Sequence, residues 1–298
     1  MTLAPELAAA LARPDGSVAL RELDRDGRLT DLIPELEAGR GYVQPELHFY
    51  DVLDHNLAAV AAFDAVIAGG ADTAELHESL GWVDVNESLE REIDGLPLLS
   101  LTRLACLVHD VAKPATAVFL DGRLRFPRHG PRGGDLLRER LPMLGLGPDA
   151  TDFVAKMVRY HLRPRELVRP WPPTDHAVRR FANDLNGHVL PLLLVNLCDG
   201  MATRGPTYTR ENFRRHCGFA SFVLARAISV FDEPESALLN GEDLMSELGL
   251  ESGRTLGAVL TSVRRAQLEG AVSDRESALA LARNFLAELV AQGGLAPG

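Results

Sequence analysis

The stretch ACLVHDVAKP, residues 105–114, places a histidine and an aspartate side by side in an otherwise apolar segment. Burying a charge without a partner costs several kcal/mol. His109 and Asp110 therefore predict a bound ligand or a polar network inside the protein. Lys113 and Pro114 follow. Because proline disfavours helical geometry in the residue before it, we expect the helix to end at Lys113 with its ammonium facing outward.

The composition of the whole chain favours helices. Ala, Leu, Arg and Glu dominate its 298 residues, while β-branched and aromatic residues are sparse. Apolar periodicity predicts two or three short helices in 1–40 and one helix over 45–68. Further predicted segments are helices near 132–144, 149–161, 174–184, 188–204 and 209–232, a surface loop at 163–174, and two or three helices in 240–292. The fold class predicted is all-α.

Other features indicate a cytoplasmic protein. No apolar run reaches about 18 residues, so no transmembrane span is expected. The N-terminus has no basic start before its apolar stretch, which argues against a signal peptide. Three cysteines without CxxC spacing predict reduced thiols and exclude a zinc site built on cysteine.

The charge distribution has two interpretations. A net charge of −11 disfavours a protein that coats itself with nucleic acid. Ten arginines nevertheless lie within residues 123–169, and four more within 204–215. They form either solvated helix faces or a positive field around an anionic substrate. Lys113 is one of two lysines, the other being Lys156, and it lies four residues after His109.

Several residues could complete a metal site with the His–Asp pair. Neighbouring residues on a helix point about 100° apart, so His109 and Asp110 can both lean toward one ion. The further candidates are His55 in YDVLDH, His129 in FPRHGPRGG, His161 in VRYHLRP and Asp199 in LLLVNLCDG. Three of these four lie in contexts that would normally be apolar or turn. The chain order of these ligands is H…HD…H…H…D.

This order resembles the HD-domain superfamily of metal-dependent phosphohydrolases. More closely, the chain resembles the C-terminal, HD-containing portion of bacterial tRNA nucleotidyltransferases, the CCA-adding enzymes. The similar stretches include LTRLACLVHDVAKPAT, FPRHGPRGGDLL and LNGEDLMSELGLESGRTLGAVLTSVRRAQLEGAVSDRESALALA, and together span most of residues 20–285. The nucleotidyltransferase head, with its Gly-rich strand and paired carboxylates, has no counterpart. Asp24 and Asp26 are interpreted as a polar turn, and we do not expect CCA addition by this chain alone.

The resemblance implies an HD-domain helical bundle over residues 1–235, with an N-terminal helical lead-in, and a small helical tail over 236–298. It also implies phosphoester hydrolysis and some affinity for RNA 3′ ends. Imidazole and carboxylate ligands suit Mn, Fe(II), Co, Ni or Mg. One or two divalent ions are expected, and Asp110 could bridge two ions about 3.5–4 Å apart. His129 and His161 would decide the number of ions.

The catalytic residues expected are Asp110 and Lys113, and Lys113, Arg132 and Arg163 are expected to hold the phosphate. His48 is either close to the metal ligands or a core residue. The remaining histidines, interpreted as ordinary surface or core residues, are His77, His176, His188 and His216.

Two classes of function remain open. The first is a phosphohydrolase acting on a phosphorylated small molecule, a nucleotide (a signalling nucleotide included) or an RNA-terminal phosphate, such as a 2′,3′-cyclic phosphate. The second is a non-catalytic RNA-binding or partner module derived from a CCA-adding enzyme. An intact ligand set favours the enzyme. A basic tail would favour the binding module, but residues 232–253 are acidic.

Overall fold

The computed structural model describes residues 3–45, 48–70, 73–168, 171–203, 209–232, 237–268 and 270–291. The described residues are mostly helical and contain two antiparallel two-stranded hairpins, which confirms the predicted all-α class. None of the described helices is both long enough and apolar enough to cross a membrane.

The chain divides into two compact units. The first comprises residues 1–172 and 185–225, and the second comprises 173–184 and 226–298. Residues 173–184 thus belong to the second unit, although residues on both sides of them belong to the first. The boundary predicted at residues 235 and 236 lies outside the described residues.

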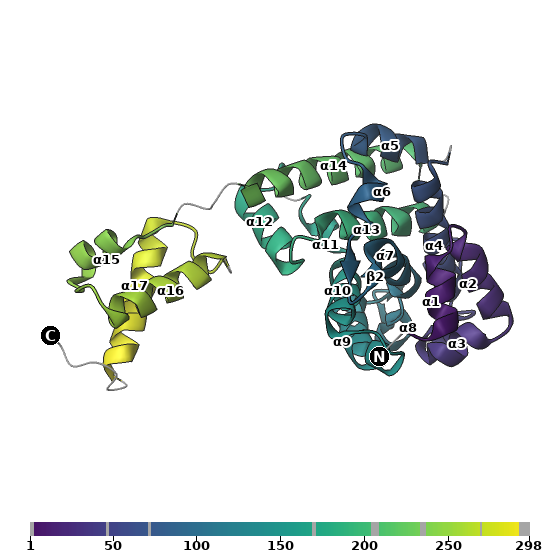
Figure 1. The fold of residues 1–298 in the computed structure, drawn as a ribbon, viewed down its shortest axis with the longest axis horizontal. Coiled ribbons are helices and arrows are strands. Elements are labelled where there is room, and N and C mark those ends of the chain that lie inside the picture. Colours follow the sequence, from purple (N-terminus) through teal and green to yellow (C-terminus); the bar gives the residue numbers. More distant parts are fainter. Residues whose placement is uncertain are drawn as a thin grey trace. The chain divides into compact units, whose positions relative to one another are not determined.

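The first unit is built mainly from short helices (Figure 1). Its helices are α1 (Pro5–Ala12), α2 (Gly16–Arg25), α3 (Arg28–Leu32), the 3-10 helix η1 (Pro34–Gly39), α4 (Val52–Ala68), α5 (Ala74–Leu80), α6 (Val85–Ser88), α7 (Leu98–Val108), α8 (Lys113–Thr116), α9 (His129–Met143), α10 (Pro148–Tyr160), α11 (Arg163–Glu166), α13 (Val189–Thr203) and most of α14 (Arg210–Asp232). Its hairpins pair β1 (Glu92–Ile93) with β2 (Leu96–Pro97), and β3 (Val118–Leu120) with β4 (Arg123–Arg125).

The second unit contains α12 (Asp175–Asp184), the end of α14, and the helices α15 (Gly241–Leu248), α16 (Arg254–Leu268) and α17 (Arg275–Ala291). Leu244, Val259, Val263 and Ala282 are among the residues of its apolar core. The core is small, as expected for a unit of this length.

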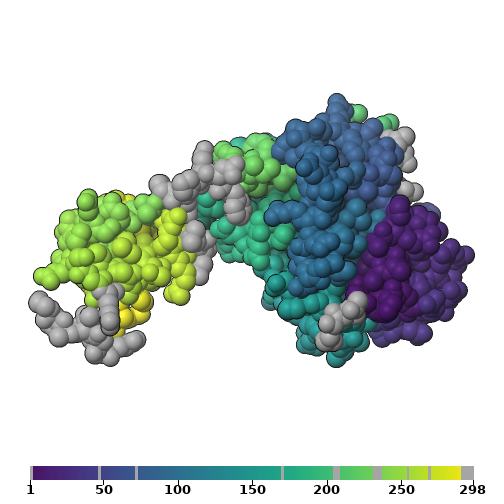
Figure 2. Space-filling model, in the orientation of Figure 1, coloured from purple at the N-terminus to yellow at the C-terminus, as the bar shows by residue number. Residues whose placement is uncertain are grey.

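Helix α7 is the centre of the first unit. Every residue from Leu98 to Val108 is buried except Leu99, and the helix packs against α1, α4, α10 and α13. The N-terminal helices α1 and α2 close one side of this core, where α2 packs on α4 (Figure 2). Because other helices cover α7 on all sides, no face of it meets water, and this explains why the segment before His109 lacks a polar face.

Two predicted boundaries are wrong. The helix expected over 45–68 begins at Val52, because the carboxylate of Asp51 caps it by accepting a hydrogen bond from the Asp54 amide at 2.7 Å. The helix expected to end at Lys113 ends at Val108, and Lys113 instead begins α8 with Pro114 in its first turn. Proline is tolerated there because the first amides of a helix have no intrahelical partner.

Some irregular segments also differ from expectation. Part of the loop predicted at 163–174 is the short helix α11, and residues 169–170 lie outside the described part of the chain. Asp24, expected in a polar turn, lies in the last turn of α2, where its Oδ1 accepts a hydrogen bond of 2.7 Å from Arg40 Nη2. Asp24 therefore forms an ion pair with Arg40.

A buried ion pair joins the N-terminal helices to α7. Arg103 is fully buried, and its Nε donates to Asp64 Oδ1 at 2.7 Å, while its Nη1 donates to the backbone oxygen of Leu11. The second oxygen of Asp64 accepts from the Ser17 amide at 2.7 Å. Asp64 thus satisfies groups from two other helices, α2 and α7.

Replacing Asp64 by Ala should destabilise the protein by about 3–5 kcal/mol, because Arg103 would remain buried without a counter-charge. Asp54→Ala is the matched control. It removes the same side chain from the same helix, but Asp54 pairs with Arg21 on the surface, where both side chains are about half exposed. Its cost should stay below about 1 kcal/mol. Urea unfolding of both variants tests this, and equal costs would contradict it.

Candidate metal centre

The structure brings together all six metal ligands expected from the sequence. They come from five segments that meet at the C-terminal end of α7. His55 lies on α4, His109 ends α7, Asp110 occupies the turn that follows, His129 begins α9, His161 ends α10, and Asp199 lies on α13. All six side chains are buried.

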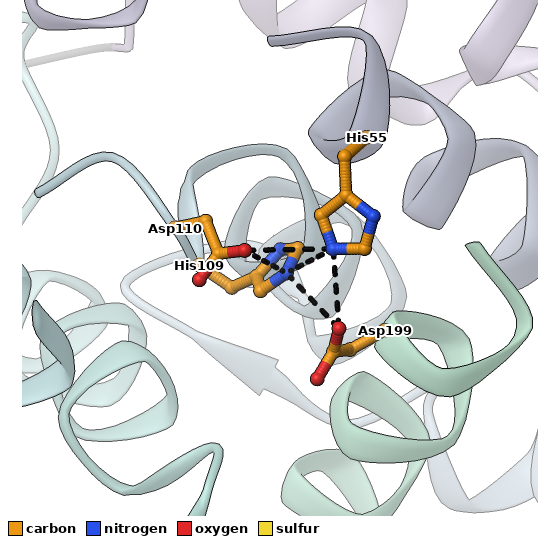
Figure 3. A group of neighbouring side chains, drawn as sticks. All are labelled: His55, His109, Asp110 and Asp199. Carbon is orange, nitrogen blue, oxygen red and sulfur yellow. Dashed lines mark hydrogen bonds and ion pairs between the residues drawn. The ribbon is translucent and has the colours of Figure 1, made fainter. Parts of the chain in front are cut away.

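Four of the ligands form a first group, shown in Figure 3. The Nε2 atom of His55 lies 3.1 Å from Asp199 Oδ1 and 3.2 Å from His109 Nε2. Asp110 Oδ2 lies 3.4 Å from His55 Nε2 and 3.3 Å from His109 Nε2. The ligand atoms of these four residues thus all lie within 4.8 Å of one another.

Asp110 also belongs to a second group. Its other oxygen, Oδ1, lies 3.2 Å from His129 Nε2 and 3.7 Å from His161 Nε2, and the two imidazole nitrogens are 3.3 Å apart. One carboxylate therefore directs one oxygen to each group. This arrangement suits a carboxylate that bridges two ions.

Three of the four imidazoles are oriented in the same way. His109 Nδ1 donates to the backbone oxygen of Cys106 at 2.8 Å, and His129 and His161 donate to those of Phe126 and Val158, both at 2.7 Å. The proton on Nδ1 leaves the Nε2 lone pair free as a ligand. Backbone oxygens in or next to the helix ends therefore orient the three rings so that their Nε2 atoms face the centre.

Two glycines on α9 allow His129 to reach His161. A Cβ atom at Gly130 would lie 2.9 Å from the backbone oxygen of Arg159, and one at Gly134 would lie 2.8 Å from that of Ala155. Any larger residue would push α9 away from α10. The glycines of HGPRGG thus set the distance between the two histidines of the second group.

Lys113 is positioned differently from the prediction. Its ammonium does not face outward but is buried, with Nζ 2.5 Å from Asp110 Oδ2 and 2.6 Å from Gln44 Oε1. His48 Nε2 lies 3.4 Å from the same nitrogen, and the His48 ring stands edge-on to His55. His48 thus lies beside the ligand cluster. Gln44, which sequence reasoning missed, had no signal in its local pattern.

The two arginines expected to hold the phosphate lie at the surface, each within three residues of a metal ligand in the sequence. Arg132 is exposed on α9, and Arg163 is partly exposed with its guanidinium 5.2 Å from the centre of the Tyr160 ring. The structure adds Arg165, whose Nη2 lies 3.3 Å from Asp199 Oδ2 while about half of the side chain is exposed. Its position in the RPRE stretch next to His161 could have suggested it.

Two buried carboxylates stay ionised in the centre, which favours the binding of a cation. Burial favours neutral carboxyls, but Lys113 and His109 hold the pKa of Asp110 well below its usual range. Hydrogen bonds from His109 and His55, with the Arg165 charge, do the same for Asp199. Burial also opposes a charge on His109, yet the two carboxylates raise its pKa to about 10. Burial lowers the pKa of His161, farther from Asp199, to about 3.

The donor set fits a divalent metal ion. Both oxygens of Asp110 are buried without a well-formed hydrogen bond from the described residues. Buried polar atoms without partners are rare unless a ligand uses them. Imidazole nitrogens and carboxylate oxygens without thiolate match Mn, Fe, Co, Ni or Mg. Cys106 and Cys198 are buried nearby but do not belong to either group.

The other histidines have separate surroundings. His77 Nε2 lies 3.1 Å from the backbone oxygen of Val66, and His188 stands edge-on to the Phe153 ring. His216 is linked to the centre through Asn196. Its Nε2 lies 2.6 Å from Asn196 Oδ1, and Asn196 Nδ2 donates to the backbone oxygen of His161 at 2.8 Å.

Comparison with known proteins shows that the chain is similar to a tRNA nucleotidyltransferase. The chain is 32% identical over 279 residues to a CC-adding tRNA nucleotidyltransferase of Thermus thermophilus. The match covers 92% of this chain and 54% of that enzyme, so the chain spans about half the length of its relative. No protein-family model matches the chain.

The metal content of purified variants should show whether each of the two ligand groups holds its own ion. Protein reloaded with Mn²⁺ and dialysed should hold about two ions if the centre is binuclear. His129→Ala should then lower the content by about one, because only the second group loses a ligand. Asp110→Ala should remove nearly all metal, because both groups lose one. If wild type holds a single ion that His129→Ala leaves in place, the centre is mononuclear.

His77→Ala is the control, since His77 lies outside both groups. Its metal content should equal that of wild type. Unchanged metal in a correctly folded Asp110→Ala protein would contradict the assignment of the centre.

Proposed function

Taking the relation to a CC-adding tRNA nucleotidyltransferase as the premise, we propose that this chain is an HD-domain phosphohydrolase of that family. Its proposed substrates are phosphoesters of nucleotides or RNA ends, such as 2′,3′-cyclic phosphates and phosphomonoesters. The observation that supports this most is the convergence of four histidines and two aspartates on two adjacent metal-ligand groups. Nucleotidyl transfer is not carried over, because the chain spans about half of the relative.

The proposed cofactor is one or two divalent ions held by His55, His109, Asp110 and Asp199, with His129 and His161 for the second ion. Ions bound there would lower the pKa of a water molecule and screen the charge of the phosphate. Asp110 keeps the two groups at a fixed separation, because each of its oxygens faces one of them. The two groups of ligands would therefore set the position of a bound phosphate.

The proposed role of Lys113 is to donate hydrogen bonds to a phosphate oxygen. Gln44 Oε1 accepts a hydrogen bond from the Lys113 ammonium, and Asp110 Oδ2 forms an ion pair with it, so these two partners fix its orientation. Arg132, Arg163 and Arg165 supply positive charge around the centre. Because this charge is local, it is compatible with a net charge of −11.

A second candidate is a tRNA-binding module without catalysis. The relative's action on tRNA favours it. The two candidates differ in whether the metal centre turns over a substrate. We place the protein in the cytoplasm in either case, which its three free, buried cysteines support.

The phosphohydrolase should cleave small phosphoesters only when loaded with metal. A screen with Mn²⁺, Co²⁺ or Mg²⁺ would include bis-p-nitrophenyl phosphate, p-nitrophenyl phosphate and 2′,3′-cyclic nucleotides. Activity should vanish after chelation, return with metal, and be lost in Asp110→Ala. A loaded wild type that hydrolyses nothing but binds tRNA tightly would replace this proposal with the binding module.

Lys113→Met should preserve metal content and lower kcat about 100-fold, because it removes one preorganised donor to the phosphate. The chain contains a matched control in its other lysine, since Lys156→Met removes only an ion pair with Asp152. Steady-state kinetics and metal analysis on both variants test this. Equal kcat for Lys113→Met and Lys156→Met would exclude the role of Lys113.

A further inference from the structure

An apolar hollow lies in the first unit beside the metal centre. Its volume is about 560 Å³, which falls within the roughly 300–1,000 Å³ of typical small-molecule sites. Trp171 and Phe219 line it together with Val168, Arg215 and His216. An aromatic wall with a cationic rim is the combination that binds the base of a nucleotide and its charge.

Its aromatic residues form a connected platform. The Trp171 ring lies 5.6 Å from Phe219 and 4.9 Å from Phe222, at interplanar angles near 50°. Trp171 is nevertheless 54% exposed and Phe222 is 37% exposed. Exposed aromatic rings held in place by one another offer stacking area at little entropic cost.

One chain of hydrogen bonds and one nearby charge relate this hollow to the metal ligands. His216, which lines the hollow, reaches the backbone of His161 through Asn196. Arg165 touches Asp199, and its charge, after burial, is the main influence that lowers the pKa of His216 to about 4. Arg165 therefore lies near both a metal ligand, Asp199, and a residue that lines the hollow, His216.

We propose that this hollow is the nucleobase subsite of the metal centre, with the base stacked on Trp171 and Phe219. Arg165 and Arg215 face the phosphate-bearing side of the nucleotide. This inference rests on the proposed function, and it narrows the substrate from phosphoesters in general to those that carry a nucleobase.

Charge distinguishes this hollow from another in the same unit. That second hollow, of about 380 Å³, is lined by Glu92, Asp94, Asp149 and Asp152 together with Lys156. Four carboxylates against one ammonium disfavour an anionic nucleotide. Among the described residues, none that lines the hollow at Trp171 carries a carboxylate.

The two tryptophans of the chain allow a direct binding test. Trp82→Phe leaves Trp171 as the sole indole, and Trp171→Phe leaves only Trp82, which donates to Ser221 outside the hollow. The full chain, stripped of metal to prevent turnover, is titrated with adenosine monophosphate. Fluorescence should change saturably in Trp82→Phe and stay constant in Trp171→Phe.

Two comparisons identify the base as the recognised group. Ribose 5-phosphate, which has the phosphate without the base, should leave Trp171 fluorescence unchanged. Phe219→Ala should weaken binding of adenosine monophosphate by about 5- to 150-fold, because one stacking surface is lost. The same loss should appear by calorimetry in Trp171→Ala, whose half-exposed side chain can be truncated without opening the core.

Equal responses to adenosine monophosphate and ribose 5-phosphate, or unchanged affinity in both Phe219→Ala and Trp171→Ala, would overturn the subsite. Failure of the proposed function is distinguishable from this. Ribose 5-phosphate carries no aromatic ring, so its hydrolysis should be insensitive to Phe219→Ala. Base binding without any hydrolysis would refute the enzyme and keep the subsite, while hydrolysis without base binding would refute the subsite alone.

Discussion

The constraint on which the structure depends is the burial of one carboxylate, that of Asp110. A buried anion must be compensated, and Asp110 is surrounded by Lys113 and by imidazoles from four segments. These partners come from α4, α7, α9 and α10, while α13 adds Asp199. The helices therefore pack in the one arrangement that brings their polar ends to Asp110. Stability and function are coupled here, because the groups that satisfy the buried charge are also the metal donors.

Backbone geometry provides the precision of the centre. His109 and His161 each donate to a backbone oxygen three residues earlier, at the end of a helix where carbonyls lack intrahelical partners. His129 makes the same contact at the start of α9. The helix termini thus orient the rings without any further side chain. Gly130 and Gly134 complete the arrangement by letting α9 approach α10 closely.

The relation to a tRNA nucleotidyltransferase and the proposed phosphoester hydrolysis are compatible, because the metal ligands and the transferase chemistry need not share residues. The match covers nearly all of this chain and about half of the relative. A metal centre beside an aromatic hollow would suit a substrate with both a phosphate and a base. His216, which lines the hollow, is linked through Asn196 to the backbone of His161, and Arg165 contacts Asp199.

The sequence by itself determined the helical class and the six candidate ligands, because helical periodicity and a His–Asp pair in an apolar segment are local signals. It located α9, α10, α12, α13 and α14 to within a few residues. It did not determine the start of α4 at Val52, the inward direction of Lys113, or the roles of Gln44, Arg165 and Trp171. Those features depend on which side chains meet across helices far apart in the chain. Tertiary packing alone decided that Asp110 divides its two oxygens between two groups of ligands.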